Sequence, residues 1–262
     1  MSLNIDHTEA AKPRGVKPVG AAKLTIEILR LLAKQPGAIG VTPLASKLDR
    51  YPGTVYAVLK TLQEEGVVEF NATTKTYRLS LGGIMEISNF KRRNDLPQQI
   101  EQDMTDLSEQ FGLCIYLSQK VRRNAMIIVA CAAPDRPLGL YAKVGHRFPV
   151  LLGGSGRLII AHQGVDETTL RQAYEDYTWP RHQPDFETWK KQVRYDFSAG
   201  YAYEEDSVPE GLATIAVVVG DPEKPIKYVI NAIAPRGDFA EDRLPVIVNA
   251  VKELAAKAKR LM

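Results

Sequence analysis

The hydrophobic pattern between residues 42 and 62 predicts two short helices joined by a tight turn. In the first segment Leu44 and Leu48 share one face, and Thr42 can cap the helix. The second segment starts at Pro52, a residue preset for a helix start. Its apolar positions fall at i, i+3, i+4 and i+7 and are Val55, Val58, Leu59 and Leu62. Each segment can therefore bury one side and leave the other in solvent.

An alternating stretch after the second helix predicts a β-hairpin. Residues 67–70 and 76–79 alternate around a polar tip at residues 71–75. A further apolar periodicity over residues 21–34 predicts a helix that packs beneath this unit. Helix, turn, helix and hairpin in this order form a winged helix-turn-helix, which places its second helix in the major groove of DNA.

A second domain of mixed helices and strands is predicted from residue 97 onward. Helices are expected over residues 98–111, 157–162, 167–174, 185–197 and 243–260, and strands over residues 113–118, 125–132, 138–143, 200–203, 212–219 and 226–233. The last two strands are strongly apolar, which is typical of central strands. We therefore predict an α+β chain whose C-terminal body surrounds one mostly antiparallel sheet. Residues 81–93 are expected to form a helix that links the two domains.

The charge is divided unevenly along the chain, although the whole sequence carries a net charge of only +3. Residues 1–94 hold 14 Lys and Arg against 8 Asp and Glu, whereas residues 95–262 hold 20 against 23. A basic N-terminal third is typical of a DNA-binding head on a body with another task, and chance asymmetry is the alternative. Residues 1–20 are predicted to be a disordered basic arm that either follows phosphates or is only solvated.

Cys114 and Cys131 lie in apolar strand-like segments and are interpreted as core thiols rather than a disulfide or metal framework. This interpretation favours a reducing compartment. The chain has no apolar run of about 18 residues and no secretory leader, so we expect a cytoplasmic protein without a membrane partner. The four histidines show no metal-ligand spacing, and we expect neither a metal nor a cofactor.

Two stretches suggest enzymatic chemistry at first sight. The glycine-rich residues 152–157 lack the ending of a P-loop, and Arg157 stands where a nucleophile elbow needs glycine. They remain a tight turn at a helix start, whose N–H groups either bind a polar ligand atom or serve packing alone. Glu204, Glu205 and Asp206 suggest paired acid–base carboxylates, a metal site or only a solvated loop. Because we find no nucleophile–base set and no metal motif, we predict no catalytic residue and no enzyme.

The exposed side of the second helix and the hairpin are predicted to contact DNA. The residues assigned to this contact are Pro52, Gly53, Thr54, Tyr56, Lys60, Thr61, Lys75 and Arg78. The helix start is best placed near base edges, whereas Lys60, Lys75 and Arg78 suit phosphates. The alternative is that all of them are merely solvated. Tyr51, just before the helix, could equally be a packing residue.

Short motifs occur along the chain in a specific order and spacing. They comprise Thr54-Val55-Tyr56, Gly66 before the hairpin, Gly145-His146-Arg147-Phe148-Pro149, Ser155-Gly156-Arg157, Gly200-Tyr201 and Pro209-Glu210-Gly211-Leu212. With these motifs the sequence resembles the IclR family of bacterial transcriptional regulators along nearly its whole length. The resemblance implies a winged-helix DNA-binding domain, a linker helix and a GAF-like α/β effector-binding domain. It also implies assembly as a homodimer or homotetramer and binding of small organic acids or aromatic metabolites.

The expected domains and the implied ligand pocket follow from this resemblance. The chain is expected to comprise a disordered basic arm over residues 1–20, a winged helix-turn-helix DNA-binding domain over residues 21–80, a linker helix over residues 81–96 and an effector-binding domain over residues 97–262. Matching the pocket positions of the family gives Gly154, Ser155, Glu204, Leu212, Thr214, Asn231 and Ile233.

The sequence departs from the family at three places. Ala57 stands where an arginine is common, Thr214 where a cysteine is common, and residues 231–235 replace a serine- and glycine-rich segment. A pocket there is expected to be more apolar, which favours an aromatic or amide-bearing ligand. We therefore expect a regulator that binds operator DNA and senses a small organic or aromatic acid-type metabolite. An enzyme with an accessory DNA-binding head, and a head that mediates only protein contacts, are the alternatives.

Overall fold

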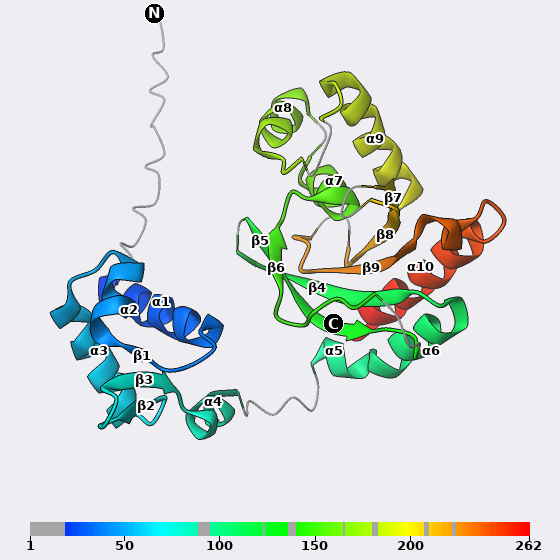
Figure 1. Cartoon of the computed structure of the whole chain (residues 1–262). Helices are drawn as coiled ribbons and strands as arrows, with labels where there is room; N and C mark the ends of the chain where they lie inside the picture. The colour runs from blue at the N-terminus through cyan, green and yellow to red at the C-terminus, as the bar shows by residue number, and fades with distance from the viewer. Residues whose placement is uncertain are drawn as a thin grey trace, which may run out of the picture. The chain divides into compact units, whose positions relative to one another are not determined.

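The hydrophobic residues gather into separate cores in the two halves of the chain. The computed structural model describes residues 19–88, 95–122, 124–135, 140–164, 166–179, 183–206, 210–221 and 224–262 (Figure 1). The chain divides into an N-terminal unit, Met1–Lys91, and a C-terminal unit, Arg92–Met262. The predicted basic arm falls almost entirely outside the described residues, and so does the second part of the predicted linker helix, over residues 89–94.

The N-terminal unit packs its helices against a small antiparallel sheet. Its elements are α1 (Gly20–Lys34), β1 (Ile39–Gly40), α2 (Val41–Leu48), α3 (Pro52–Glu64), β2 (Val68–Asn71), β3 (Thr76–Leu79) and α4 (Leu81–Ser88). Strand β3 lies between β1 and β2. The predicted helix pair and hairpin are confirmed, but α2 already starts at Val41, so its N-cap is Gly40 and not Thr42. The two-residue strand β1 was not predicted, because it is too short to show an alternation.

The core of this unit is made by one face of each helix. The fully buried side chains include Ile28 of α1, Leu44 of α2 and Leu59 of α3. Helix α2 ends at Leu48. The following residue, Asp49, takes a left-handed conformation with φ of 53°, and the chain then turns into α3. Because Pro52 occupies the first turn of α3, the helix starts there without losing a hydrogen bond.

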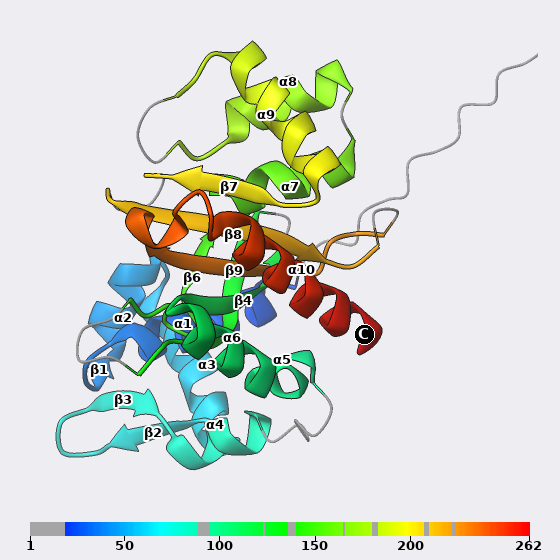
Figure 2. The same ribbon diagram turned by 90° about the vertical axis from the view of Figure 1, so that its right-hand side faces the viewer.

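The C-terminal unit is built around one antiparallel sheet with helices on both faces (Figures 1 and 2). Its helical elements are α5 (Leu96–Gln99), α6 (Glu101–Phe111), α7 (Gly153–Gln163), α8 (Glu167–Asp176), α9 (Phe186–Ala199), the 3₁₀ helix η2 (Arg236–Phe239) and α10 (Leu244–Arg260). Its strands are β4 (Cys114–Arg122), β5 (Ala125–Ala132), β6 (Arg147–Pro149), β7 (Ala202–Glu205), β8 (Leu212–Val219) and β9 (Tyr228–Pro235). They lie in the order β6-β5-β4-β9-β8-β7.

The two faces of this sheet are covered by different helices. On one face, α6 and α10 pack against side chains such as Leu117 and Ile230. On the other face, α7 packs against side chains such as Ala216 and Val229. Since side chains alternate along a strand, Tyr116 and Ser118 of β4 point to the face opposite that of Leu117, toward α7. The sheet therefore separates the surroundings of α7 from those of α6 and α10.

Several predicted elements need correction. Residues 140–143 form no strand, and residues 138 and 139 of the same expected strand lie outside the described part of the chain. The helix expected over residues 98–111 is interrupted at Ile100 and becomes α5 and α6. The helix expected from residue 157 already starts at Gly153, so the glycine-rich turn forms its first turn. The edge strand β6 was not predicted, because three residues do not show an alternation.

Candidate DNA-contact surface and ligand pocket

One side of α3 is free of contact with the core of its unit. Val55, Leu59 and Leu62 are buried, whereas the predicted contact residues on this helix are exposed, namely Pro52, Gly53, Thr54, Tyr56, Lys60 and Thr61. Tyr51, whose role was left open, is 82% exposed and therefore does not pack into the core of this unit. The inward stripe and the outward side of the helix therefore lie where the periodicity places them.

The two basic residues predicted to contact DNA from the hairpin, Lys75 and Arg78, have different surroundings. Lys75 is exposed at the turn, where it takes a left-handed conformation with φ of 56°. Arg78 is held by Glu69, whose Oε2 accepts from Nε of Arg78 at 2.8 Å and lies 2.7 Å from Nη2. A phosphate contact of Arg78 has to compete with this exposed ion pair, which contributes little to stability.

A cavity of about 290 Å³ lies beside the first turn of α7, on the sheet face that this helix covers. Its walls are mostly aromatic and aliphatic and include Tyr116, Ile128, Leu140, Tyr141, Phe148 and Leu152. The predicted pocket residues that line it are Gly154, Ser155, Leu212, Thr214, Asn231 and Ile233. Residues from β4, β5, β8, β9 and α7 thus meet at one cavity, which we call the α7 pocket.

A chain of hydrogen bonds joins the polar side chains beside this pocket. Ser155 Oγ donates to Asn231 Oδ1 at 2.6 Å, and Asn231 Nδ2 donates to Ser118 Oγ at 3.2 Å. Ser118 Oγ in turn donates to the carbonyl oxygen of Val229 at 3.1 Å. Because Ser118, Ser155 and Asn231 are buried, this network satisfies polar groups that are costly to leave unpaired.

The glycines of α7 allow the helix to approach its neighbours closely. A Cβ atom on Gly154 would lie 2.8 Å from Cβ of Ala202, and one on Gly156 would lie 2.9 Å from the backbone of Leu151. Both distances are shorter than ordinary van der Waals contacts. The glycine-rich stretch therefore serves packing in its own right, in addition to forming one wall of the α7 pocket.

Glu204 does not line the α7 pocket with the other predicted residues, because its carboxylate pairs with a buried arginine. Oε2 of Glu204 lies 3.0 Å from Nη1 of Arg157. Arg157 also donates from Nε to Oδ2 of Asp196 at 2.6 Å and from Nη2 to the carbonyl oxygen of Tyr203 at 3.2 Å. The predicted acidic run thus provides one carboxylate of a buried ion cluster.

The charges of this cluster depend on one another. Burial opposes the charge of Arg157, but Glu204 and Asp196 raise its pKa, so the guanidinium keeps its proton. Burial raises the pKa of Asp196 and of Glu204, against the opposing effect of the arginine. One cation therefore compensates two carboxyl groups, which makes Arg157 the central member of the cluster.

A thiol pair lies close to the α7 pocket. Sγ of Cys114 and Sγ of Cys131 are 3.6 Å apart, and both thiols are free. Cys131 faces the pocket residue Tyr116 across the β4–β5 pairing. The hydrogen bond between the thiols raises the pKa of Cys114 and lowers the pKa of the more exposed Cys131 to about 7.

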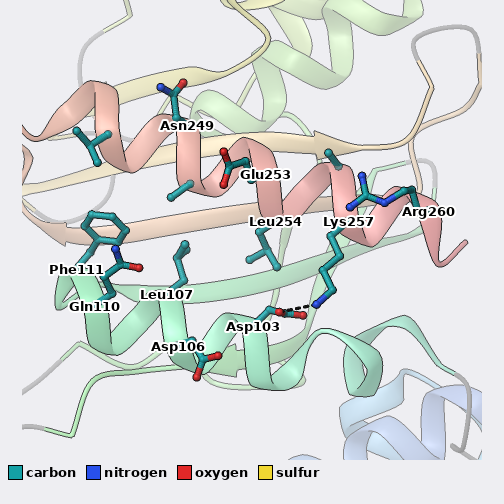
Figure 3. A pocket seen from close by; sticks show the side chains of 13 residues that line it. Asp103, Asp106, Leu107, Gln110, Phe111, Asn249, Glu253, Leu254, Lys257 and Arg260 are labelled. Atoms are coloured by element: carbon teal, nitrogen blue, oxygen red, sulfur yellow. Dashed lines mark hydrogen bonds and ion pairs between the residues drawn. The ribbon is translucent and has the colours of Figure 1, made fainter.

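A second hollow, of about 770 Å³, lies between α6 and α10 (Figure 3). Charged and apolar side chains line this groove together, and Lys257 Nζ reaches across from α10 to Asp103 Oδ1 of α6 at 2.7 Å. Asp106 and Glu253 also line it. None of the predicted pocket residues lines this groove, which lies on the far side of the sheet from α7.

The ranges that the structure describes contain neither a metal-binding cluster nor a membrane-spanning helix. No group of three or more His, Cys, Asp and Glu side chains is placed to hold a metal ion there. None of the helices in those ranges is long and apolar enough to cross a membrane.

Some pocket residues were missed by the sequence analysis. Tyr116 and Ile128 share a sheet face with Asn231, and the alternation along β4 and β5 would have placed them there if the order of the strands had been known. Tyr141 and Ala142 fall in the strand that was wrongly predicted over residues 138–143, and the structure gives this segment neither strand nor helix. Asp196 gave no signal, because a single acidic residue in an amphipathic helix is normally solvated.

Each of the two units matches a domain of a known protein family. Residues 24–72 match the IclR helix-turn-helix domain, and residues 90–260 match the C-terminal domain of the bacterial transcriptional regulator IclR. This chain belongs to the IclR family. It is therefore a transcriptional regulator with a helix-turn-helix DNA-binding domain and a C-terminal effector domain. The second match covers most of the chain and includes all residues of the α7 pocket.

Relatives of known name and structure agree with this assignment. The chain is 23% identical to the glycerol operon regulatory protein of Streptomyces griseus over 89% of this chain and 92% of that protein. It is 24% identical to the transcriptional regulator XynR of Escherichia coli over 85% of this chain and 90% of that protein. An IclR regulator from Alicyclobacillus acidocaldarius has the same fold, with a TM-score of 0.79 at 22% identity, over 94% of this chain and 99% of the other. An IclR homolog from Microbacterium hydrocarbonoxydans, solved with 4-hydroxybenzoate, has a TM-score of 0.69 at 16% identity. The match covers 92% of this chain and 98% of the other.

Proposed function

We propose that this IclR-family regulator senses a small aromatic or amide-bearing organic acid in the α7 pocket, and that the ligand changes its affinity for operator DNA. The α7 pocket is the observation that supports this proposal best. Its volume of about 290 Å³ and its mainly apolar walls suit a small ring, and its few polar groups can orient a ligand. The IclR homolog from Microbacterium hydrocarbonoxydans was solved with a ligand of this class.

The lining suggests how such a ligand would be held. The backbone N–H groups at the start of α7 have no partner within the helix and can receive a carboxylate or amide oxygen, but the N–H of Gly154 already bonds to the carboxylate of Glu204. The rings of Tyr116 and Phe148 can pack against an aromatic ring. Ser155 and Asn231 already bond to each other, so a ligand atom that uses either of them has to share or replace that bond.

Regulation by this ligand requires two arrangements of the protein with different ligand affinities. A ligand shifts the equilibrium between them only by the difference of those affinities. We infer that the chain acts as a homodimer or homotetramer, because a helix-turn-helix protein engages two half-sites in adjacent major grooves with two heads. The exposed side of α3 and the hairpin would supply the DNA contacts, and the protein would act in the cytoplasm, where bacterial DNA lies.

A thermal-shift titration tests the ligand class. Benzoate, 4-hydroxybenzoate, benzamide and acetate are titrated against the purified full-length protein. A ligand of the native state raises its stability by RT ln(1 + [L]/Kd), about 2.7 kcal/mol at a hundredfold excess over Kd. We expect the aromatic compounds to raise the melting temperature and acetate to leave it unchanged. A series in which no aromatic compound shifts the melting temperature contradicts the proposed ligand class.

Two matched variants locate the bound ligand. Ile233→Trp fills the α7 pocket, whereas Gln110→Trp places the same side chain in the groove between α6 and α10. We expect the first to abolish the thermal shift and the second to preserve it. The opposite outcome would place the ligand in the groove. Consumption of the ligand during the titration would favour the enzyme alternative.

A further inference from the structure

The side of α3 that is free to enter a groove carries an unusual set of side chains. The exposed residues at its start and along its first two turns are Tyr51, Pro52, Gly53, Thr54, Tyr56 and Ala57. All of residues 51–59 are described, and none of them is charged or carries a side-chain amide. This surface therefore offers carbon atoms and hydroxyl groups to whatever it contacts.

Each base is recognised in the major groove by a different side-chain chemistry. Guanine is most often read by paired donors of Arg or Lys, adenine by the amide of Asn or Gln, and cytosine by a carboxylate. The methyl group of thymine is instead recognised by apolar contact with side chains such as Ala, Thr or an aromatic ring. The exposed start of α3 holds only groups of this last kind, together with hydroxyl groups that are compatible with several bases.

Two polar side chains that border this surface, those of Arg50 and Thr61, contact other groups of the protein. Arg50 donates from Nη1 to the carbonyl oxygen of Asp49 at 3.1 Å, and its Nη2 lies 3.7 Å from Oε2 of Glu27. The Thr61 hydroxyl donates to the carbonyl oxygen of Ala57 at 3.2 Å. Lys60 lies two turns into the helix, where side chains more often meet the phosphate backbone than base edges.

The two tyrosines dominate the free surface. Tyr51 is 82% exposed and Tyr56 is 51% exposed, although large aromatic rings usually bury most of their surface. Tyr51 precedes the helix and Tyr56 lies in its second turn, so both stand at the end of α3 that approaches base edges in a helix-turn-helix. Burial of these rings against thymine methyl groups would remove apolar surface from water on both sides.

We propose that α3 recognises its operator chiefly through thymine methyl groups, with Tyr51, Thr54, Tyr56 and Ala57 as the contacting side chains. The centre of each half-site is then rich in A·T pairs, and Lys60 and the hairpin supply phosphate contacts without sequence preference. This inference rests on operator binding by the head and adds the chemical group that the head reads.

The test compares thymine with deoxyuridine, which lacks only the 5-methyl group. A random duplex library is selected with the full-length protein, and the enriched sequence is then synthesised with thymine or with deoxyuridine. We expect the deoxyuridine duplex to bind about fourfold more weakly for each contacted methyl group. The loss is measured by fluorescence anisotropy at a fixed salt concentration, because DNA affinity depends strongly on salt.

Variants of the full-length protein assign the effect to side chains. Tyr51→Ala and Tyr56→Ala should each weaken binding to the thymine duplex and bring the two affinities closer together, whereas Tyr56→Phe should retain the discrimination. Lys60→Ala should weaken both duplexes equally and reduce the salt slope by about one. Thermal melting of each variant shows whether its fold is intact.

The outcomes separate this inference from the function on which it rests. An enriched operator that binds equally well with thymine and deoxyuridine, or whose dominant positions are G·C pairs, contradicts methyl recognition and leaves operator binding in place. A selection that enriches no sequence contradicts operator binding itself, and the inference falls with it.

Discussion

Helices α3 and α7 both begin at a turn rich in glycine or proline, but the protein uses them in opposite ways. Of the 13 residues of α3, Val55, Leu59 and Leu62 are buried, and its other sides face solvent or lie partly covered. Of the 11 residues of α7, all from Gly153 to Ala161 are buried. The first helix leaves one side exposed to solvent, and the second forms part of the interior.

This difference in burial determines whether the side chains of a helix can be interpreted without their neighbours. The free side of α3 has few partners in its own unit, so its side-chain composition alone defines what it can contact. The roles of the polar residues of α7 depend on their partners. Arg157 forms ion pairs with Asp196 and Glu204, and Ser155 donates a hydrogen bond to Asn231. A surface helix can therefore be interpreted residue by residue, whereas a buried helix has to be interpreted with its neighbours.

The strongest test of this contrast is the removal of the buried cation of α7. Arg157→Met leaves Asp196 and Glu204 buried without their counter-charge, and we expect a loss of about 3–5 kcal/mol in the free energy of unfolding. Glu204→Gln is the matched control, because Asp196 still compensates the arginine, and we expect it to cost about 1 kcal/mol or less. Urea denaturation of both variants measures these values, and equal losses would contradict the central place of Arg157.

The same variant should respond to pH in a defined direction. Without Arg157, the pKa of each buried carboxyl group lies further above its unfolded value of about 4. The folded state then binds more protons than the unfolded state above that pH, so its stability falls as the pH rises. We expect the deficit of Arg157→Met relative to wild type to be largest at neutral pH and to shrink on acidification.

The next largest effect concerns the two sides of α3. Leu59 is fully buried, and Leu59→Ala should cost about 2–5 kcal/mol through lost contacts and a residual cavity. Tyr56→Ala, on the free side of the same helix, should change stability by no more than about 0.5 kcal/mol. Chemical denaturation of the full-length protein measures both changes. A similar cost for both substitutions would mean that Tyr56 is packed and not available to DNA.

A smaller effect is expected from the close approach of α7 to the sheet. In Gly154→Ala the added methyl group would meet Cβ of Ala202 at 2.8 Å, and the strain should cost about 1–3 kcal/mol. Gly82→Ala in α4 has free space and should be neutral or stabilising by up to about 1 kcal/mol. Thermal melting compares the two variants, and a neutral Gly154→Ala would show that the close packing there is not required.

The smallest predicted effect is chemical and leaves stability unchanged. The thiolate of Cys131 is stabilised by the hydrogen bond from Cys114, and its pKa is lowered to about 7. At pH 7 we expect iodoacetamide to label Cys131 about tenfold faster than Cys114, with a rate that rises as the pH increases through 7. Peptide mass spectrometry follows both sites. Faster labelling of Cys114 would reverse the assignment of donor and acceptor.

In the N-terminal unit, local sequence patterns predict both the helices and the side of α3 that is buried. The stripe of Val55, Leu59 and Leu62 predicts which side of α3 is buried, because a helix repeats every 3.6 residues and the core selects its apolar face. The hairpin follows from the alternation around residues 71–75 in the same way. Tyr51 could not be assigned, since a single aromatic residue before a helix has no periodicity that tells surface from core.

In the C-terminal unit, local patterns predict single strands but not which strands or side chains lie next to each other. The apolar strands β8 and β9 were predicted with nearly their observed bounds, but their neighbours in the sheet were not. The position of Glu204 illustrates the consequence. The predicted strand over residues 200–203 ended one residue before it. Whether its side chain faced a ligand or a buried arginine depended on α7, which lies far from it in the sequence.

The sequence by itself determined the family, the helix-turn-helix and the inward face of α3, because these depend on short motifs and on local periodicity. The family resemblance supplied six of the fifteen residues that line the α7 pocket. Only the tertiary structure decided that Glu204 pairs with Arg157, that Cys114 meets Cys131 and that Tyr116 joins the pocket wall. Those contacts arise from strand order and from the packing of α7 against the sheet, and both bring together residues whose separation along the chain carries no pattern.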